Sequence, residues 1–139
     1  MVKAHLQAVI DGDLKTVWQI VIDNEHYAWR RDLQKIIVAD DGQSFTELSK
    51  NGMETHFVIT VQEYCSRYEF TLENSNLRGH WQGLFSATTG GTRLELIEEL
   101  EVKKPLLRLV AGKYLRHAQQ RYLADLRREV ERQNVAKSK

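Results

Sequence analysis

The chain has 139 residues, 42% hydrophobic and 28% charged, a balance typical of one globular domain that buries roughly two-thirds of its unfolded surface. A single cysteine, Cys65, excludes an internal disulfide and a cysteine-based zinc site. No apolar run approaches the roughly 20 residues of a membrane span, and the N-terminus lacks a signal-peptide pattern, so we expect a cytoplasmic protein.

The net charge of +1 hides an asymmetry along the chain. Residues 1–102 contain 9 Lys/Arg and 16 Asp/Glu, whereas residues 103–139 contain 11 Lys/Arg and 3 Asp/Glu. A basic segment on an acidic body can meet an anionic membrane surface or nucleic acid. Because acidic residues are interspersed among the basic ones, we favour a solvated outer face and expect no nucleic-acid partner.

The N-terminal segment predicts a strand followed by two short helices. Residues 2–10 alternate apolar and polar side chains, as a half-buried strand does. Asp13 is a suitable helix N-cap, and the apolar residues from Leu14 to Ile22 follow the spacing of one helix face. A second short helix is expected over residues 25–31.

From Leu33 onward the apolar period changes to two, which indicates a series of strands. We predict strands over residues 33–39, 44–49, 54–63, 66–73, 77–87 and 92–102. Glycine-containing turns separate several of them, and Asn51-Gly52 and Gly90-Gly91 are typical of tight hairpins. Consecutive hairpins predict an antiparallel sheet, which has about seven strands when the first strand is included.

The last predicted element is a helix from Pro105 to about Arg132, roughly 40 Å long at 1.5 Å per residue. Its expected apolar face consists of Leu106, Leu107, Val110, Ala111, Tyr114, Ala118, Tyr122, Leu126 and Val130. Only this helix is long enough to cover one face of the sheet. We therefore predict a single α+β domain over residues 1–133, in which a curved sheet grips the helix, and a frayed tail over residues 134–139.

Several local features agree in order with a known family. They are Val17-Trp18 in the first helix, Tyr27-Ala28-Trp29-Arg30, Gly79-His80-Trp81 in a late strand, and Pro105-Leu106 at the start of the long helix. With this order of elements the sequence resembles the START/Bet v 1-like (helix-grip) superfamily, which includes polyketide cyclase/dehydrase-like and lipid-transfer proteins. The resemblance implies a cavity between sheet and helix for an apolar or amphipathic ligand, and carries over no catalytic residue.

Glu98 is the most unusual residue of the last strand. By alternation it shares a face with Leu96 and Leu100, where an unpaired carboxylate would cost several kcal/mol. It is therefore a candidate polar anchor, or a candidate catalytic acid/base with a raised pKa. The alternative is a bulge near residues 97–99 that turns Glu98 outward.

Aromatic side chains on the strands and the long helix are candidates for the cavity wall, although such residues are usually plain core. The predicted ligand-binding residues are Phe57, Tyr68, Trp81, Glu98, Tyr114 and Tyr122. Gly112 lies within the long helix, where glycine is unfavourable. It indicates a kink or a close approach where a ligand enters, or it is simply a tolerated glycine. The five histidines lack metal-ligand spacing, so we expect no metal and no cofactor.

Three functions follow from these observations. The leading hypothesis is a binding protein for a hydrophobic small molecule, such as a lipid or a polyketide-like compound, with transient membrane contact allowed. An alternative is a cyclase/dehydrase-type enzyme that uses Glu98 in the same cavity. A third is an interaction module whose basic helix face, including Arg116, Arg121 and Arg128, binds RNA, a membrane or a protein.

Overall fold

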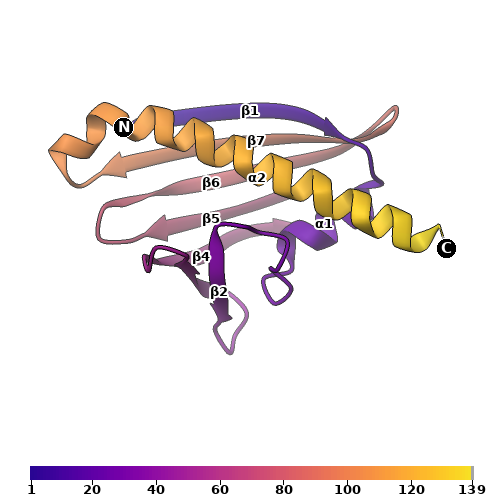
Figure 1. Ribbon diagram of the computed structural model, residues 1–139, viewed down its shortest axis with the longest axis horizontal. Helices are drawn as coiled ribbons and strands as arrows, with labels where there is room; N and C mark the ends of the chain where they lie inside the picture. The colour runs from indigo at the N-terminus through magenta and orange to yellow at the C-terminus, as the bar shows by residue number, and fades with distance from the viewer. Residues whose placement is uncertain (139) are drawn as a thin grey trace.

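Seven antiparallel strands form one open sheet in the computed structural model, which describes residues 1–138 (Figure 1). The strands are β1 (Val2–Ile10), β2 (Leu33–Val38), β3 (Ser44–Ser49), β4 (Glu54–Glu63), β5 (Arg67–Glu73), β6 (Leu77–Thr88) and β7 (Gly91–Val102). Their order across the sheet is β1-β7-β6-β5-β4-β3-β2, so β2 to β7 form a meander and β1 pairs with the last strand. β1 and β2 are therefore the two edge strands of the sheet.

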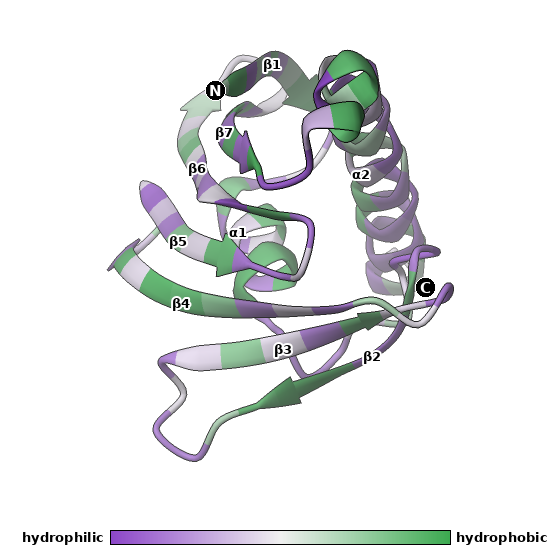
Figure 2. Cartoon of the chain, turned by 90° about the vertical axis from the view of Figure 1, so that its left-hand side faces the viewer, coloured by the Kyte–Doolittle hydropathy of each residue, from purple (hydrophilic) through white to green (hydrophobic). Residues whose placement is uncertain are grey.

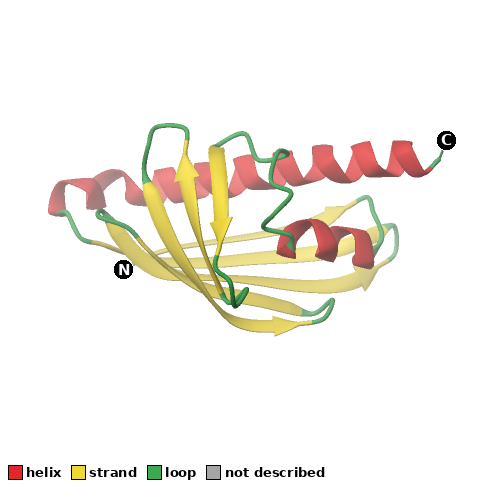
Figure 3. Cartoon of the chain, turned by 90° about the horizontal axis from the view of Figure 1, so that it is seen from below, coloured by secondary structure: helices red, strands yellow, loops and turns green. Residues whose placement is uncertain are grey.

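Two α-helices lie on the same side of this sheet (Figure 3). The first, α1 (Leu14–Ile22), follows β1, and the second, α2 (Arg108–Lys137), follows a short 3-10 turn (Pro105–Leu107). The sheet curves around α2, as the view in Figure 2 shows. The predicted fold class, a curved antiparallel sheet that grips a long C-terminal helix, is confirmed.

The predicted second short helix is not formed, because residues 25–31 make turns instead. The Asp23 carboxylate accepts hydrogen bonds from the backbone N–H groups of Glu25 (3.0 Å) and His26 (3.2 Å). Such side-chain bonds compete with helical backbone bonds. The Arg30 N–H then donates to the Tyr27 carbonyl at 2.9 Å, which closes a further turn.

The long helix extends beyond its predicted end. It continues through Lys137, whereas a frayed tail was expected from residue 134. Asn134 Nδ2 donates to the Asp11 carbonyl at 3.0 Å, and Lys137 Nζ donates to Thr16 Oγ1 at 2.8 Å. These contacts tie the last helical turns to the segment around α1. The final residue of the predicted tail lies outside the described residues.

The buried face of α2 differs from the predicted one in its N-terminal half. The buried residues are Ala111, Leu115, Gln119, Leu123, Asp125, Leu126 and Val130. Four residues expected on that face are exposed: Leu106 and Leu107 in the preceding 3-10 turn, and Val110 and Tyr114 in α2. The C-terminal half packs into the core with α1 and the sheet, whereas the N-terminal half lies over a cavity and the molecular surface.

The core is densest where α1 meets the sheet. Trp18 is almost fully buried, and its ring makes edge contacts with Tyr68 and Phe85 at centroid separations of 6.3 and 5.0 Å. Leu126 and Val130 of α2 belong to the same buried cluster. This end of the molecule is filled by side chains and fixes the direction in which α2 crosses the sheet.

Candidate functional site

A cavity of about 710 Å³ lies between the sheet and the N-terminal half of α2. This volume falls within the range of small-molecule binding sites. Its wall includes side chains from β2 to β7, from α2 and from the segment between α1 and β2. The sheet forms the floor because its concave face curves away from the helix at this end.

Stacked aromatic rings form much of the cavity floor. Phe70 stacks on Trp81 with ring centroids 4.7 Å apart, and Phe45 stacks on Phe57 at the same separation. Tyr122 of α2 meets Trp81 edge to face at 6.1 Å, so the helix contacts the floor at one end of the cavity. Such pairs restrict the rings to one arrangement, which gives a preformed apolar wall.

All six predicted ligand-binding residues lie on the cavity wall: Phe57, Tyr68, Trp81, Glu98, Tyr114 and Tyr122. Their surroundings differ. Phe57 and Trp81 belong to the buried floor, whereas Tyr114 is largely exposed and stands at the rim. Their role in ligand binding stays a prediction.

Glu98 faces the cavity. The strand β7 pairs in continuous register with both neighbours, and Glu98 lies opposite Ala4 on β1 and Trp81 on β6. The alternative of an outward-turning bulge is therefore wrong. Within residues 1–138, the Glu98 carboxyl group has no hydrogen-bond or ion-pair partner. Burial, with a further contribution from the charge of Glu47, raises its pKa to about 7, although Arg30 acts in the opposite direction.

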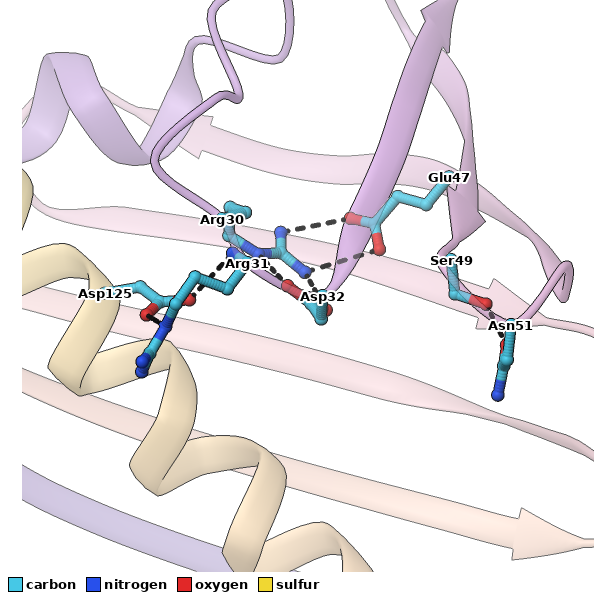
Figure 4. Close-up of polar contacts among 7 residues, drawn as sticks. All are labelled: Arg30, Arg31, Asp32, Glu47, Ser49, Asn51 and Asp125. Carbon is cyan, nitrogen blue, oxygen red and sulfur yellow. Dashed lines mark hydrogen bonds and ion pairs between the residues drawn. The ribbon is translucent and has the colours of Figure 1, made fainter.

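A buried ion cluster, which no sequence pattern predicted, lies on the same wall (Figure 4). Arg30 Nη1 is 3.3 Å from Glu47 Oε2, and Arg30 Nη2 and Nε are 2.9 and 3.1 Å from the two Asp32 oxygens. The side chains of Arg30 and Glu47 are only 16% and 15% exposed. The Arg30 guanidinium thus joins the segment before β2 to β3.

One signal in the sequence could have identified Glu47. By alternation it shares a face of β3 with the buried Phe45, the same argument that singled out Glu98. No comparable signal identified its partner, because Arg30 lies in an irregular turn. The pairing depends on where that turn places the side chain.

Carboxyl groups outnumber guanidinium groups in this part of the cavity wall. Burial raises the pKa of Glu47, although the charge of Arg30 acts in the opposite direction. Burial acts to lower the pKa of Arg30, but Glu47 and Asp32 raise it overall, so the guanidinium stays protonated. Together with Glu98, three carboxyl groups accompany one buried guanidinium, and other basic residues line the cavity elsewhere. A carboxyl group can accept a hydrogen bond in either protonation state, so this part of the wall can bind a hydrogen-bond donor on a ligand.

Two tyrosine hydroxyl groups complete the polar part of the wall. Tyr68 Oη accepts a hydrogen bond from Asn24 Nδ2 at 3.1 Å, and burial raises the pKa of this tyrosine. The Tyr122 ring lies 5.3 Å from Arg30 Cζ, and burial likewise raises the Tyr122 pKa. Both hydroxyl groups stay neutral at ordinary pH and can donate or accept a hydrogen bond.

Within residues 1–138, no group of three or more His, Cys, Asp or Glu side chains is arranged to hold a metal ion. None of the helices in this described part is both long and apolar enough to cross a membrane. The arrangement at the cavity can hold an apolar body, and its Glu98 carboxyl group can exchange a proton near neutral pH.

Comparison with known proteins relates this architecture to a family. Residues 1–131 match the family model described as polyketide cyclase / dehydrase and lipid transport. Comparison with curated proteins found no match.

Solved structures share the fold at low sequence identity. A START superfamily protein from Mycobacterium smegmatis has a TM-score of 0.83 and 14% identity over 94% of this chain and 97% of its own. A conserved protein from Geobacillus kaustophilus has a TM-score of 0.82 and 10% identity over 94% and 96%. DynU16, from the dynemicin biosynthetic locus, has a TM-score of 0.74 and 12% identity over 94% of this chain and 48% of its own.

Proposed function

The chain belongs to the polyketide cyclase/dehydrase and lipid transport family, and we propose that it binds a hydrophobic or amphipathic small molecule beneath α2. The observation that carries the proposal is the unpaired Glu98 carboxyl group on the wall of a 710 Å³ cavity whose floor holds stacked aromatic rings. Glu98 is half-buried between the buried Leu96 and Leu100, where a purely structural core would place an apolar residue, because a carboxyl group removed from water without a partner destabilises the fold.

The ligand that fits this wall has an apolar body and one polar end. The body lies against the rings of Phe57, Phe70 and Trp81, where burial contributes roughly 25 cal/mol per Å² of apolar surface. The polar end carries a hydrogen-bond donor, such as a hydroxyl group, that meets Glu98. Lipids and polyketide-like compounds both have this character.

Native mass spectrometry of the purified protein tests for a bound small molecule directly. Titration with the neutral fluorescent probe N-phenyl-1-naphthylamine measures the cavity without knowledge of the natural ligand. Ala118 lines the cavity, so Ala118→Phe should fill it and weaken probe binding at least tenfold. Ala124→Phe, on the exposed side of the same helix, is the matched control and should leave affinity unchanged. Equal probe affinity in both variants would refute a cavity-based function.

An enzyme of the cyclase/dehydrase type is the second candidate. It is favoured by the Glu98 pKa of about 7, because a general acid/base works best when its pKa lies near the working pH. Glu98→Gln should then abolish turnover of a poly-β-ketone substrate and retain binding of the neutral probe. Absence of turnover in the wild-type protein over a panel of such substrates would leave the binding function as the better account.

A further inference from the structure

A patch of exposed apolar side chains lies at the start of α2. We call it the entrance patch, and its residues are Leu106, Leu107, Leu109, Val110 and Tyr114. Leu106 and Leu109 are 84% and 87% exposed, so almost their entire apolar surface meets solvent. Single exposed leucines are ordinary, but a contiguous apolar patch is typical of an interaction site.

The entrance patch adjoins the opening of the cavity. Leu107, Val110 and Tyr114 are exposed and also line the cavity, whereas Leu106 and Leu109 do not line it. The cavity therefore reaches the surface beside the patch. Any surface that covers the entrance patch would also meet the cavity rim.

The segment that carries the entrance patch is basic, although Lys103 pairs with Glu73 and Glu101 lies near Arg108. Residues 103–124 contain six Lys and Arg residues and no Asp or Glu. Lys104, Arg108 and Lys113 have no ion-pair partner within residues 1–138, whereas two arginines farther along α2 pair with acidic residues of the same helix. The N-terminal end of a helix also carries the positive end of its dipole.

We propose that the entrance patch docks on a lipid bilayer that contains anionic lipids. Such a surface offers hydrocarbon for the leucines at the headgroup boundary and negative headgroups for the lysines and arginines. Nucleic acid would match the charge but leave the leucines in water. The body of residues 1–102, with 9 Lys/Arg against 16 Asp/Glu, is repelled by the same bilayer, which favours an approach through the basic segment that carries the entrance patch.

This proposal goes beyond ligand binding in the cavity, because docking requires no occupied cavity. Its test is co-sedimentation of the purified protein with phosphatidylcholine vesicles prepared with and without phosphatidylglycerol. The wild-type protein should bind the anionic vesicles, and added salt should weaken that binding. The variant Arg108→Glu/Leu109→Glu should bind at least tenfold more weakly, because it removes one cation and one apolar contact.

The matched control is Lys35→Glu/Ile37→Glu, which makes the same kind of change at exposed positions of the edge strand β2. This control should retain wild-type vesicle binding. An equal loss of vesicle binding in both variants would overturn the proposal. So would wild-type binding that is the same with and without phosphatidylglycerol. The proposal would also be overturned if the wild-type protein does not bind vesicles but self-associates with rising concentration, and Leu109→Glu abolishes this self-association. The entrance patch would then be a contact between two copies of the chain.

Binding of N-phenyl-1-naphthylamine separates this proposal from the proposed function. Neither Arg108 nor Leu109 lines the cavity, so probe affinity should be unchanged in Arg108→Glu/Leu109→Glu. If this variant loses vesicle binding and retains probe binding, membrane docking is a property separate from ligand binding in the cavity. Loss of probe binding in this variant would contradict the proposed separation of entrance patch and cavity.

Discussion

Arg31 and Asp125 join two segments that lie 94 positions apart in the chain. The Asp125 carboxylate accepts hydrogen bonds from the Arg31 backbone N–H at 3.0 Å and from Arg31 Nε at 2.5 Å (Figure 4). Arg128 Nη2 adds a third at 3.2 Å, and Asp125 itself is fully buried. This contact fastens the irregular segment before β2 to α2, and thereby fixes the roof of the cavity.

Asp125→Asn should lower the free energy of unfolding by about 2–3 kcal/mol, because the buried group loses its charge-assisted hydrogen bonds. Urea denaturation measures this change. Glu131→Gln, at an exposed position of the same helix, is the control and should have little effect. Similar stability of the two variants would show that the contact with Arg31 contributes nothing to the fold.

The stability of the protein should depend on pH through Glu98. Its pKa is about 7 when folded and near the ordinary 4.5 when unfolded, so between these values the folded state binds more protons. Stability therefore falls as the pH rises through this window, by roughly 3 kcal/mol at about 1.4 kcal/mol per pKa unit. Glu98→Gln should be more stable than wild type at pH 8, with the advantage lost towards pH 4.

Unfolding curves of both proteins across this pH range provide the measurement. Glu47 also has a raised pKa, so the wild-type curve contains its contribution as well. The difference between wild type and Glu98→Gln isolates the cavity carboxyl group. A difference that stays constant with pH would contradict the unpaired position of Glu98.

The ion pair between Arg30 and Glu47 should behave as a buried one. Arg30→Met leaves two carboxylates without their partner and should lower the free energy of unfolding by about 3–5 kcal/mol. Adding Glu47→Gln should recover part of this loss, because it removes one of the unpaired charges. A double-mutant cycle in urea measures the coupling.

Arg78 provides the control for this cycle. It also forms two hydrogen bonds with one carboxylate, that of Glu101, but on the exposed face of the sheet. Arg78→Met should leave the stability near that of wild type, because solvent screens the pair. An equal loss for Arg30→Met and Arg78→Met would contradict the buried character of the cluster.

Two glycines should respond oppositely to alanine. At Gly112 an added Cβ would meet its nearest atom, Arg116 Nη1, at an ordinary 3.5 Å, so alanine should stabilise the helix by about 0.5–1 kcal/mol. At Gly79 a Cβ would collide with the backbone oxygen of Glu99, so alanine should destabilise the sheet. Thermal unfolding of both variants checks this contrast. Destabilisation by Gly112→Ala would instead support the interpretation that Gly112 allows a close approach.

Local patterns of residues were sufficient to predict the strands and their hairpin turns. Alternation located the strands to within a residue or two, and turn residues such as Asn51-Gly52 located the hairpins. Alternation also predicted Glu98 on the inner face, and the continuous register of β7 excludes the alternative of a bulge.

In contrast, the buried side of α2 and the pairing of charged side chains depend on how the elements pack together. The expected helix face included Val110 and Tyr114, yet both are exposed, because the helix turns its N-terminal half over a cavity. Arg30, in an irregular turn, pairs with Glu47 on β3, and Arg31 pairs with Asp125, which lies 94 positions further along the chain. Such contacts depend on how separate elements pack, and no local periodicity encodes the distance between them.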